Sequence, residues 1–541
     1  MSLNIFKLCA MPRLLPVVLA ALALLTPAAH AAVPGITGTS FDLRAEASFI
    51  SQPDGSMVYS WGYGCNTAPS STAFVPAAIA RASCPSMQIP GPTLIVQENT
   101  EFKVTLTNRL PVGAGNTSIL FPGLQLLSTN GGTTGLLTQE ATTASPVTYT
   151  LIAKSPGTRA YYSGTQGDLQ VEMGLYGAVI VLPASGGSSA CRALAPTLPD
   201  GQTDFRLAAS AYDHAATCYD REYLFQFSEI DPKIHRQAEE QVAAIAACVP
   251  PDPASGLSPC PKTLNVVTEN YHPAYFMING RSMPDDMDAN YQTQVYPHQP
   301  YNGNPHMHPG ELVLLRIIGQ GRWQHPFHEH GNHVRVLARD GNLILSAADP
   351  TRLAGPLLFT TTTTPGQALD GIFYWTGKGL NWDVYGHGYT GDPSVCIPDA
   401  NGYYTQLANG NGQPNGVPNS AATEPNYYEW CQDHKKALEK SPFGAVAGGG
   451  PVTLPDANIL TDGAWYGGSP YLGPDANTRA TGSTPIPPAG TVVNSPGTEA
   501  GFAFMWHSHN EREITTNDIF PGGMMMMMLV DPQAFTIDES L

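Results

Sequence analysis

Two short histidine stretches decide the fold that this sequence predicts: His325-Pro326-Phe327-His328-Glu329-His330-Gly331 and Trp506-His507-Ser508-His509. Each contains a His-x-His step, and a β-strand points residues i and i+2 to the same face. Two such strands lying side by side would gather four imidazoles into one small volume. The pattern therefore predicts a β-scaffold that carries a metal site, with these candidate ligands: His325, His328, His330, His507 and His509.

The alternative is that these histidines are polar residues whose ring nitrogens are satisfied by local hydrogen bonds. Neutral imidazole is a good ligand for copper, zinc, iron and nickel. A single His-x-His step would favour the hydrogen-bonded alternative, whereas two steps, one with a further histidine upstream, favour a metal. Other histidines rank lower. His298, His306 and His308 precede an expected strand, and His306-Met307-His308 could be a second metal-binding patch, but we favour its interpretation as a solvated loop.

The N-terminal residues have the pattern of a secretory signal peptide. Lys7 and Arg13 supply positive charge, and the apolar run from Leu14 to Leu25 is too short to span a bilayer well. Ala29-His30-Ala31 fits a small-x-small cleavage site. We therefore expect residues 1–31 to be removed, and we expect no membrane span in the mature chain.

Length and charge limit the class of protein. A chain of 541 residues favours two or three domains over one core. Its formal net charge of −18 argues against nucleic acid as a partner.

The cysteines indicate disulfides. Nine are present, and Cys9 lies in the predicted signal peptide, so an even number remains in a chain that we expect to be exported. The connectivity stays open, but neighbours in the sequence suggest four pairs: Cys65–Cys84, Cys191–Cys218, Cys248–Cys260 and Cys396–Cys431. None of them adjoins a histidine stretch, so we expect no thiolate metal ligand.

Short β-rich runs between Gly- and Pro-containing turns predict an all-β fold built from sandwiches. Strands are expected at 92–96, 102–107, 147–152, 176–182, 223–227, 311–318, 333–338 and 371–375. Asp231 is the expected N-cap of a helix over 233–247. We expect an N-terminal domain at 32–185 and a C-terminal domain at 203–541. An irregular insertion at about 378–498 would include a helix near 427–440.

The sequence resembles the multicopper oxidase and nitrite-reductase-like cupredoxin family over most of residues 35–380 and 497–535. The stretches that carry the resemblance are Gly91-Pro92-Thr93-Leu94, Gly174 to Val181, Tyr219 to Tyr223, Pro365 to Asp370, and above all His325 to Gly331 with His507-Ser508-His509. The resemblance implies two cupredoxin-like Greek-key β-sandwich domains, with a large irregular insertion in the second. It also implies a type 1 copper site of two His, one Cys and often an axial Met. That site feeds a trinuclear cluster held by His-x-His pairs from both ends of the chain.

The sequence departs from the family pattern where the chemistry resides. The positions of the N-terminal cluster histidines hold Leu120, Pro122, Tyr162 and Gly164. Ser508 stands in the place of the copper-binding Cys, and Glu513 in that of the second type 1 His. The resemblance thus implies that the blue copper–thiolate bond and half of the cluster are missing. His328, His330, His507 and His509 remain as cluster-type ligands, and His325 as a type 1 ligand.

Copper is the cofactor that these residues predict, with manganese, iron or zinc, or no metal at all, as the alternatives. A carboxylate from Glu329, Glu511 or Glu513 would shift the preference towards manganese or iron, and Met524 is a further auxiliary ligand by resemblance. The first hypothesis for function is a periplasmic or secreted oxidoreductase whose metal site has fewer ligands than that of the family. A small-molecule or metal-ion reductant would supply its electrons. The rival is a non-catalytic extracellular binding or assembly scaffold. Metal ions are the expected partners, and a homo-oligomer stays open.

Overall fold

The computed structural model describes most of the chain outside the N-terminus and residues 379–498. The described residues are 33–76, 79, 81–193, 206–251, 259–378, 499–531 and 535–537, with short pieces at 400, 406–408, 414–418, 467–471, 477–478 and 492–493. Over these residues the chain consists mainly of β-sheets with few helices, so the predicted all-β class is confirmed.

The first β-sandwich is formed by two five-stranded sheets with the orders β11-β12-β5-β1-β4 and β3-β2-β6-β10-β7. The strands are β1 (Gly35–Thr37), β2 (Ser40–Ser51), β3 (Met57–Cys65), β4 (Phe74–Val75), β5 (Leu94–Gln97), β6 (Glu101–Asn108), β7 (Gln125–Gly131), β10 (Val147–Ile152), β11 (Gly157–Tyr162) and β12 (Tyr176–Leu182). In β10 the apolar residues Val147, Tyr149 and Leu151 alternate with half-buried ones. This period of two turns one face of the strand into the core.

The second sandwich has a seven-stranded and a six-stranded sheet. The first has the order β14-β13-β16-β22-β18-β19, with β20 paired to β18, and the second has the order β15-β29-β28-β17-β21, with β25 paired to β28. The first sheet contains β13 (Arg221–Ile230), β14 (Tyr275–Ile278), β16 (Leu312–Gly319), β18 (Val334–Arg339), β19 (Asn342–Leu343), β20 (Leu357–Leu358) and β22 (Ala368–Tyr374). The second contains β15 (His306–Met307), β17 (His325–Glu329), β21 (Thr360–Thr363), β25 (Gly468–Tyr471), β28 (Gly501–Ser508) and β29 (Met525–Val530).

A run of methionines lines the core of the second sandwich. Met524, Met526 and Met528 are fully buried in its apolar cluster, together with Phe327 and Trp506. Met527, from the opposite phase of the strand, is only half-buried. The run therefore serves packing, as strand alternation predicts.

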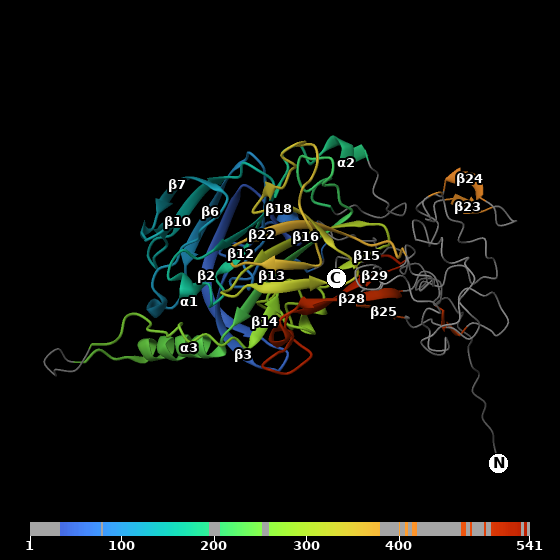
Figure 1. The fold of residues 1–541 in the computed structure, drawn as a ribbon. Helices are drawn as coiled ribbons and strands as arrows, with labels where there is room; N and C mark the ends of the chain where they lie inside the picture. Colours follow the sequence, from blue (N-terminus) through green and yellow to red (C-terminus); the bar gives the residue numbers. More distant parts are fainter. Residues whose placement is uncertain are drawn as a thin grey trace, which may run out of the picture.

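The two sandwiches pack against each other through apolar side chains. Ile95, Ala178 and Ile180 of the first form one buried cluster with Leu224 and Ile318 of the second. Figure 1 shows β28 and β29, in red, to the right of the blue and teal strands of the first sandwich. β28 is the strand that carries Trp506 and His507 of the second histidine stretch.

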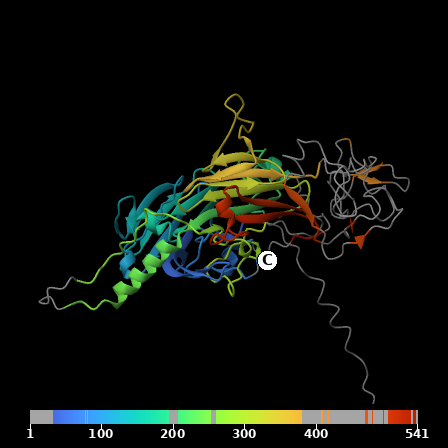
Figure 2. The same ribbon diagram turned by 60° about the horizontal axis from the view of Figure 1, so that its bottom comes forward.

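The expected helix is present as α3 (Pro232–Ala247). The Asp231 side chain accepts a hydrogen bond from the backbone N–H of Lys233, and Pro232 occupies the first turn, so the predicted cap is confirmed. The helix lies against β3 of the first sandwich, where the His235 Nδ1 atom is 2.6 Å from the Tyr59 carbonyl oxygen. Figure 2 shows it as the long green helix.

Disulfides join three pairs of neighbouring cysteines: Cys65 with Cys84, Cys191 with Cys218, and Cys248 with Cys260. The suggested Cys396–Cys431 pair, the signal peptide at 1–31 and the helix near 427–440 lie outside the described residues. So does most of the proposed insertion. No described helix is both long and apolar enough to cross a membrane.

Candidate metal centre

The two histidine stretches are neighbouring strands of one sheet. β17 and β28 run antiparallel and pair His328 with His507 and Phe327 with Ser508. Just beyond β28, the backbone N–H of His509 donates to the Pro326 carbonyl oxygen at 2.8 Å. The structure therefore brings the two His-x-His steps side by side.

The four imidazoles of these steps form one cluster. The ring of His328 lies 4.8 Å from that of His330, 5.5 Å from that of His507 and 4.9 Å from that of His509, measured between centroids. His330 and His507 are 5.1 Å apart on the same measure. One ligand nitrogen each from His328, His330 and His507 lies within 4.8 Å of the other two. His509 is exposed beside them and forms the rim of the cluster.

Backbone carbonyls fix the orientation of two of the rings. The Nδ1 atom of His507 is 2.8 Å from the Ser508 carbonyl oxygen, and that of His330 is 3.3 Å from the Gly467 carbonyl oxygen. A carbonyl oxygen only accepts, so each Nδ1 carries the proton. In a neutral ring, Nε2 then offers a lone pair, which is the arrangement that second-shell hydrogen bonds give to metal-binding histidines.

The lone pairs of His330 and His507 point at each other. Their Nε2 atoms are 3.2 Å apart. Two neutral acceptors at that distance repel, unless a cation or a proton lies between them. Two nitrogens on one tetrahedral ion, each about 2.0–2.1 Å from it, are about 3.3 Å apart. The observed separation is therefore close to the one that a shared ion requires.

Burial keeps the cluster neutral. Burial first, and then the neighbouring rings of His330, His507 and His509, lower the pKa of His328 to about 4. Burial also lowers the pKa values of His330 and His507. A metal ligand must be deprotonated, so these rings are ready to bind at neutral pH.

His325 does not join the cluster. Its Nε2 atom is 2.9 Å from Glu229 Oε2 and its Nδ1 atom 2.8 Å from Glu513 Oε2, with all three side chains buried. Position 325 is out of phase with 328 and 330 along β17, and it shares a face with the core residue Phe327. In this geometry His325 is therefore not part of the three-histidine ligand set.

The auxiliary carboxylates also lie apart from the cluster. Glu329 is buried on the Phe327 face, accepts a hydrogen bond from Thr361 Oγ1 at 2.6 Å, and has a pKa that burial raises to about 8. Glu513 is bound to His325, and Glu511 is exposed. Met524 belongs to the apolar core. Among the described residues, the three-histidine ligand set includes no carboxylate.

The positions that replace the N-terminal cluster histidines also meet in space. Leu120 and Tyr162 are bridged by backbone hydrogen bonds, and with Gly164 they line a hollow of about 290 Å³. Its opposite wall comes from the second sandwich at Gln320 and Gly366. None of its described lining residues is a histidine, so this half of the family's cluster has no imidazole ligand here.

The interpretation of residues 298–308 as a solvated loop is wrong for His308. This ring is fully buried, with Nδ1 3.0 Å from Glu311 and Nε2 2.8 Å from the Phe535 carbonyl oxygen. His306 lies 2.8 Å from Asp531 and, with the exposed Glu499, forms a second group of metal-type ligands. Glu311 lies only three residues from His308, whereas Asp531 and Glu499 lie far from His306 in the chain, so the local sequence did not reveal the second group.

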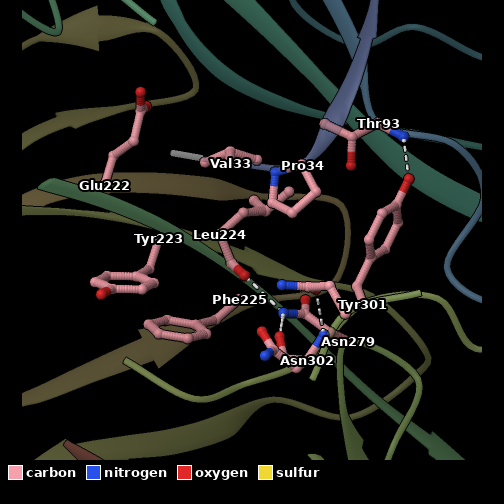
Figure 3. A pocket seen from close by; sticks show the side chains of 11 residues that line it. Val33, Pro34, Thr93, Glu222, Tyr223, Leu224, Phe225, Asn279, Tyr301 and Asn302 are labelled. Carbon is pink, nitrogen blue, oxygen red and sulfur yellow. Dashed lines mark hydrogen bonds between the residues drawn. The ribbon is translucent and has the colours of Figure 1, made fainter. Parts of the chain in front are cut away.

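A separate small cavity lies where the two sandwiches meet. It has a volume of about 20 Å³ and is lined by Glu222, Thr93 and Tyr301, among others (Figure 3). The Thr93 backbone N–H donates a hydrogen bond to the Tyr301 hydroxyl oxygen at 3.1 Å. A space of this size holds about one water molecule, so it is too small for an organic substrate.

Comparisons with known proteins agree with the resemblance. Residues 80–186 match the family model for multicopper oxidase. No curated protein matches. Solved structures that align include a blue copper oxidase from Nitrosomonas europaea, with 15% identity over 91% of this chain and 85% of that one and a TM-score of 0.42. A copper nitrite reductase from the same organism aligns with 16% identity over 62% and 84% and a TM-score of 0.36.

A laccase from Botrytis aclada aligns with 16% identity over 63% of this chain and 48% of that one, with a TM-score of 0.34. The family model matches the sequence itself, within the first sandwich. Residues 80–186 of this chain are thus similar to the multicopper oxidase family.

Proposed function

We propose that this chain is an exported metal-binding protein of the multicopper oxidase type. Its single metal centre lies on the second sandwich and has fewer ligands than the family's copper cluster. His328, His330 and His507 are the ligands, and His509 is the exposed residue at the rim. Three disulfides among the described residues support a periplasmic or extracellular location, because such bonds persist in oxidising compartments.

The observation that carries this proposal is the opposed pair of Nε2 atoms at 3.2 Å. Each ring is held by a carbonyl oxygen at Nδ1, which directs the two Nε2 atoms towards each other. An ion would remove this repulsion and gain ligands that need little reorientation. The convergence of the two Nε2 atoms supports a shared ion over the alternative of hydrogen bonding alone.

Copper or zinc suits this site better than manganese or iron. Imidazole is a ligand of intermediate softness, and the harder ions prefer carboxylate oxygens. The ligand set holds three histidines and no acidic group. When bound, copper would supply one-electron chemistry, whereas the protein's own part is to fix the tautomers and to leave one side open at His509.

Four-electron oxygen reduction by a single chain is not part of the proposal. That chemistry uses a cluster with ligands from both domains, and Leu120, Tyr162 and Gly164 offer no imidazole. An oxidoreductase activity of this chain would therefore involve a smaller centre, with the reductant reaching it at the exposed rim.

Elemental analysis of the purified full-length protein, loaded separately with Cu²⁺ and with Zn²⁺ and then desalted, tests the proposal. We expect about one tightly bound ion per chain, lost in His507→Ala and retained in His272→Ala, a matched change at an exposed histidine. Equal metal in both variants would move the site elsewhere, with His306 and Asp531 next in line. No metal in the loaded wild type would favour a non-catalytic scaffold.

A further inference from the structure

The residues that the resemblance assigns to the type 1 copper position meet in the structure, but as an ionic group. His325 Nδ1 lies 2.8 Å from Glu513 Oε2, and the Ser508 hydroxyl donates to the same oxygen. Ser508 has no thiolate to offer, and Glu513 has no imidazole. A type 1 copper ion therefore does not fit this set of side chains.

A second carboxylate closes the group from the other side. Glu229, on β13, places Oε2 2.9 Å from His325 Nε2. The three side chains His325, Glu229 and Glu513 are each at most 1% exposed. With a carboxylate oxygen at each ring nitrogen, both nitrogens of His325 are in position to donate, which requires the imidazolium form.

The remaining oxygens of the two carboxylates are occupied by donors. Glu229 Oε1 accepts from the backbone N–H groups of Arg322 at 2.7 Å and Trp323 at 2.8 Å, and from the Tyr271 hydroxyl at 3.0 Å. Glu513 Oε1 accepts from Asn510 Nδ2 at 2.8 Å. Donors at all four oxygens favour ionised carboxylates, so the proton of this group resides on the imidazole.

We infer that a protonated His325, clamped between Glu229 and Glu513, takes the place of the type 1 copper ion in this chain and excludes metal from that position. The positive charge of the ring replaces the charge of the ion. The same contacts join β13, β17 and the turn after β28, which holds together the strands that carry the histidine cluster.

The surrounding charges agree with this assignment. Burial lowers the pKa of His325, but the hydrogen bonds and charges of Glu229 and Glu513 outweigh it and raise the pKa to about 9. These two carboxylates are the charged groups that act on the ring. Glu172 and Arg322 lie beyond Glu229. Burial has the largest effect on the pKa of Glu172 and raises it. The charge of Glu229 raises this pKa by less, and the charge of Arg322 lowers it by less.

The functional consequence concerns electron delivery. A salt-bridged imidazolium does not change its oxidation state. His325, three residues from His328, therefore cannot store an electron as a type 1 copper ion would. The histidine cluster then lacks the relay that its family uses, and a reductant has to act on the cluster directly. This step rests on the proposed metal centre, whereas the protonation of His325 does not.

NMR of the full-length protein with ¹⁵N-labelled histidine side chains tests the inference, with the His325 signals assigned from a His325→Gln variant. We expect both ring nitrogens of His325 to be protonated at pH 8. Addition of Zn²⁺ should leave these signals unchanged. A singly protonated His325 at pH 8, or loss of a His325 proton on Zn²⁺ binding, would overturn the inference. The pH 8 result decides it even if the cluster binds no zinc.

If His325→Gln does not fold, a pair of milder variants gives the assignment. Glu513→Gln removes one of the two clamping charges, and Glu511→Gln removes an exposed charge two residues away. We expect the His325 titration midpoint to fall in Glu513→Gln and to stay unchanged in Glu511→Gln. Equal midpoints in both variants and the wild type would contradict the clamp.

Discussion

The buried imidazolium of His325 predicts a defined pH dependence of stability. Its pKa rises from 6.5 in the unfolded chain to about 9 in the folded protein. A shift of roughly 2.5 units corresponds to about 3 kcal/mol of folding stability. Because the folded pKa is the higher one, this stabilisation is fully present below pH ~6.5 and is lost as the pH rises through about 9.

The perturbation that isolates this effect is Glu513→Gln. Removal of the Glu513 charge leaves Glu229 alone to hold the His325 ring. The variant therefore has less of the folding stability that the imidazolium contributes at pH 6, and it loses less stability when the ring deprotonates at high pH. Urea unfolding of wild type and variant, followed from pH 6 to pH 10, measures the difference. We expect the wild type to be the more stable at pH 6, by up to about 3 kcal/mol, and the gap to narrow above pH 9.

Other titrating groups act on both proteins alike, so the difference between the curves is the relevant quantity. Glu511→Gln serves as the control, because this residue is exposed and lies outside the triad. Its curve should run parallel to that of the wild type. If the Glu513→Gln curve also runs parallel over the whole range, His325 is not held as a cation and the reasoning fails.

Three further outcomes are expected. Copper-loaded protein should show no intense blue absorption band. Ser508→Cys alone should not confer laccase turnover, since Leu120 and Gly164 still replace cluster ligands. Oxygen uptake with a phenol in that variant would contradict this expectation. Gly467→Ala should weaken metal binding by at least tenfold in a competition titration, because its Cβ would lie 1.6 Å from His330 Nδ1; unchanged affinity would show that the Gly467 contact does not orient the ring. Dialysis at stepwise lower pH should leave the metal bound below the usual imidazole midpoint of ~6.5 and release it towards pH 4, as the lowered pKa of His328 requires; release already at pH 6.5 would place the ion elsewhere.

Strand periodicity was sufficient to predict the core of the site. The His-x-His steps repeat with the period of a β-strand, and the structure pairs His328 with His507 in adjacent strands. The same rule applied to position 325 would have separated it from 328 and 330, since an odd spacing reverses the face. The spacing signal was therefore available for His325, although the resemblance favoured treating it as a ligand.

The supporting residues could not be found in the same way. Glu229 reaches His325 from β13, and the Gly467 carbonyl reaches His330 from β25. Each lies about 100 residues or more away in the sequence and has no local signature. Their roles depend on strand order and on backbone direction, which periodicity within one segment does not specify.

The central claim is that His330 and His507 share an ion through their Nε2 atoms. The most direct measurement is an anomalous difference map from crystals of the zinc- or copper-loaded protein, collected at the absorption edge of the metal. We predict one strong peak about 2.0–2.1 Å from both Nε2 atoms and from a ring nitrogen of His328, with His325 still bound to Glu229 and Glu513. A peak at His325, or one only at His306 and Asp531, would contradict the account.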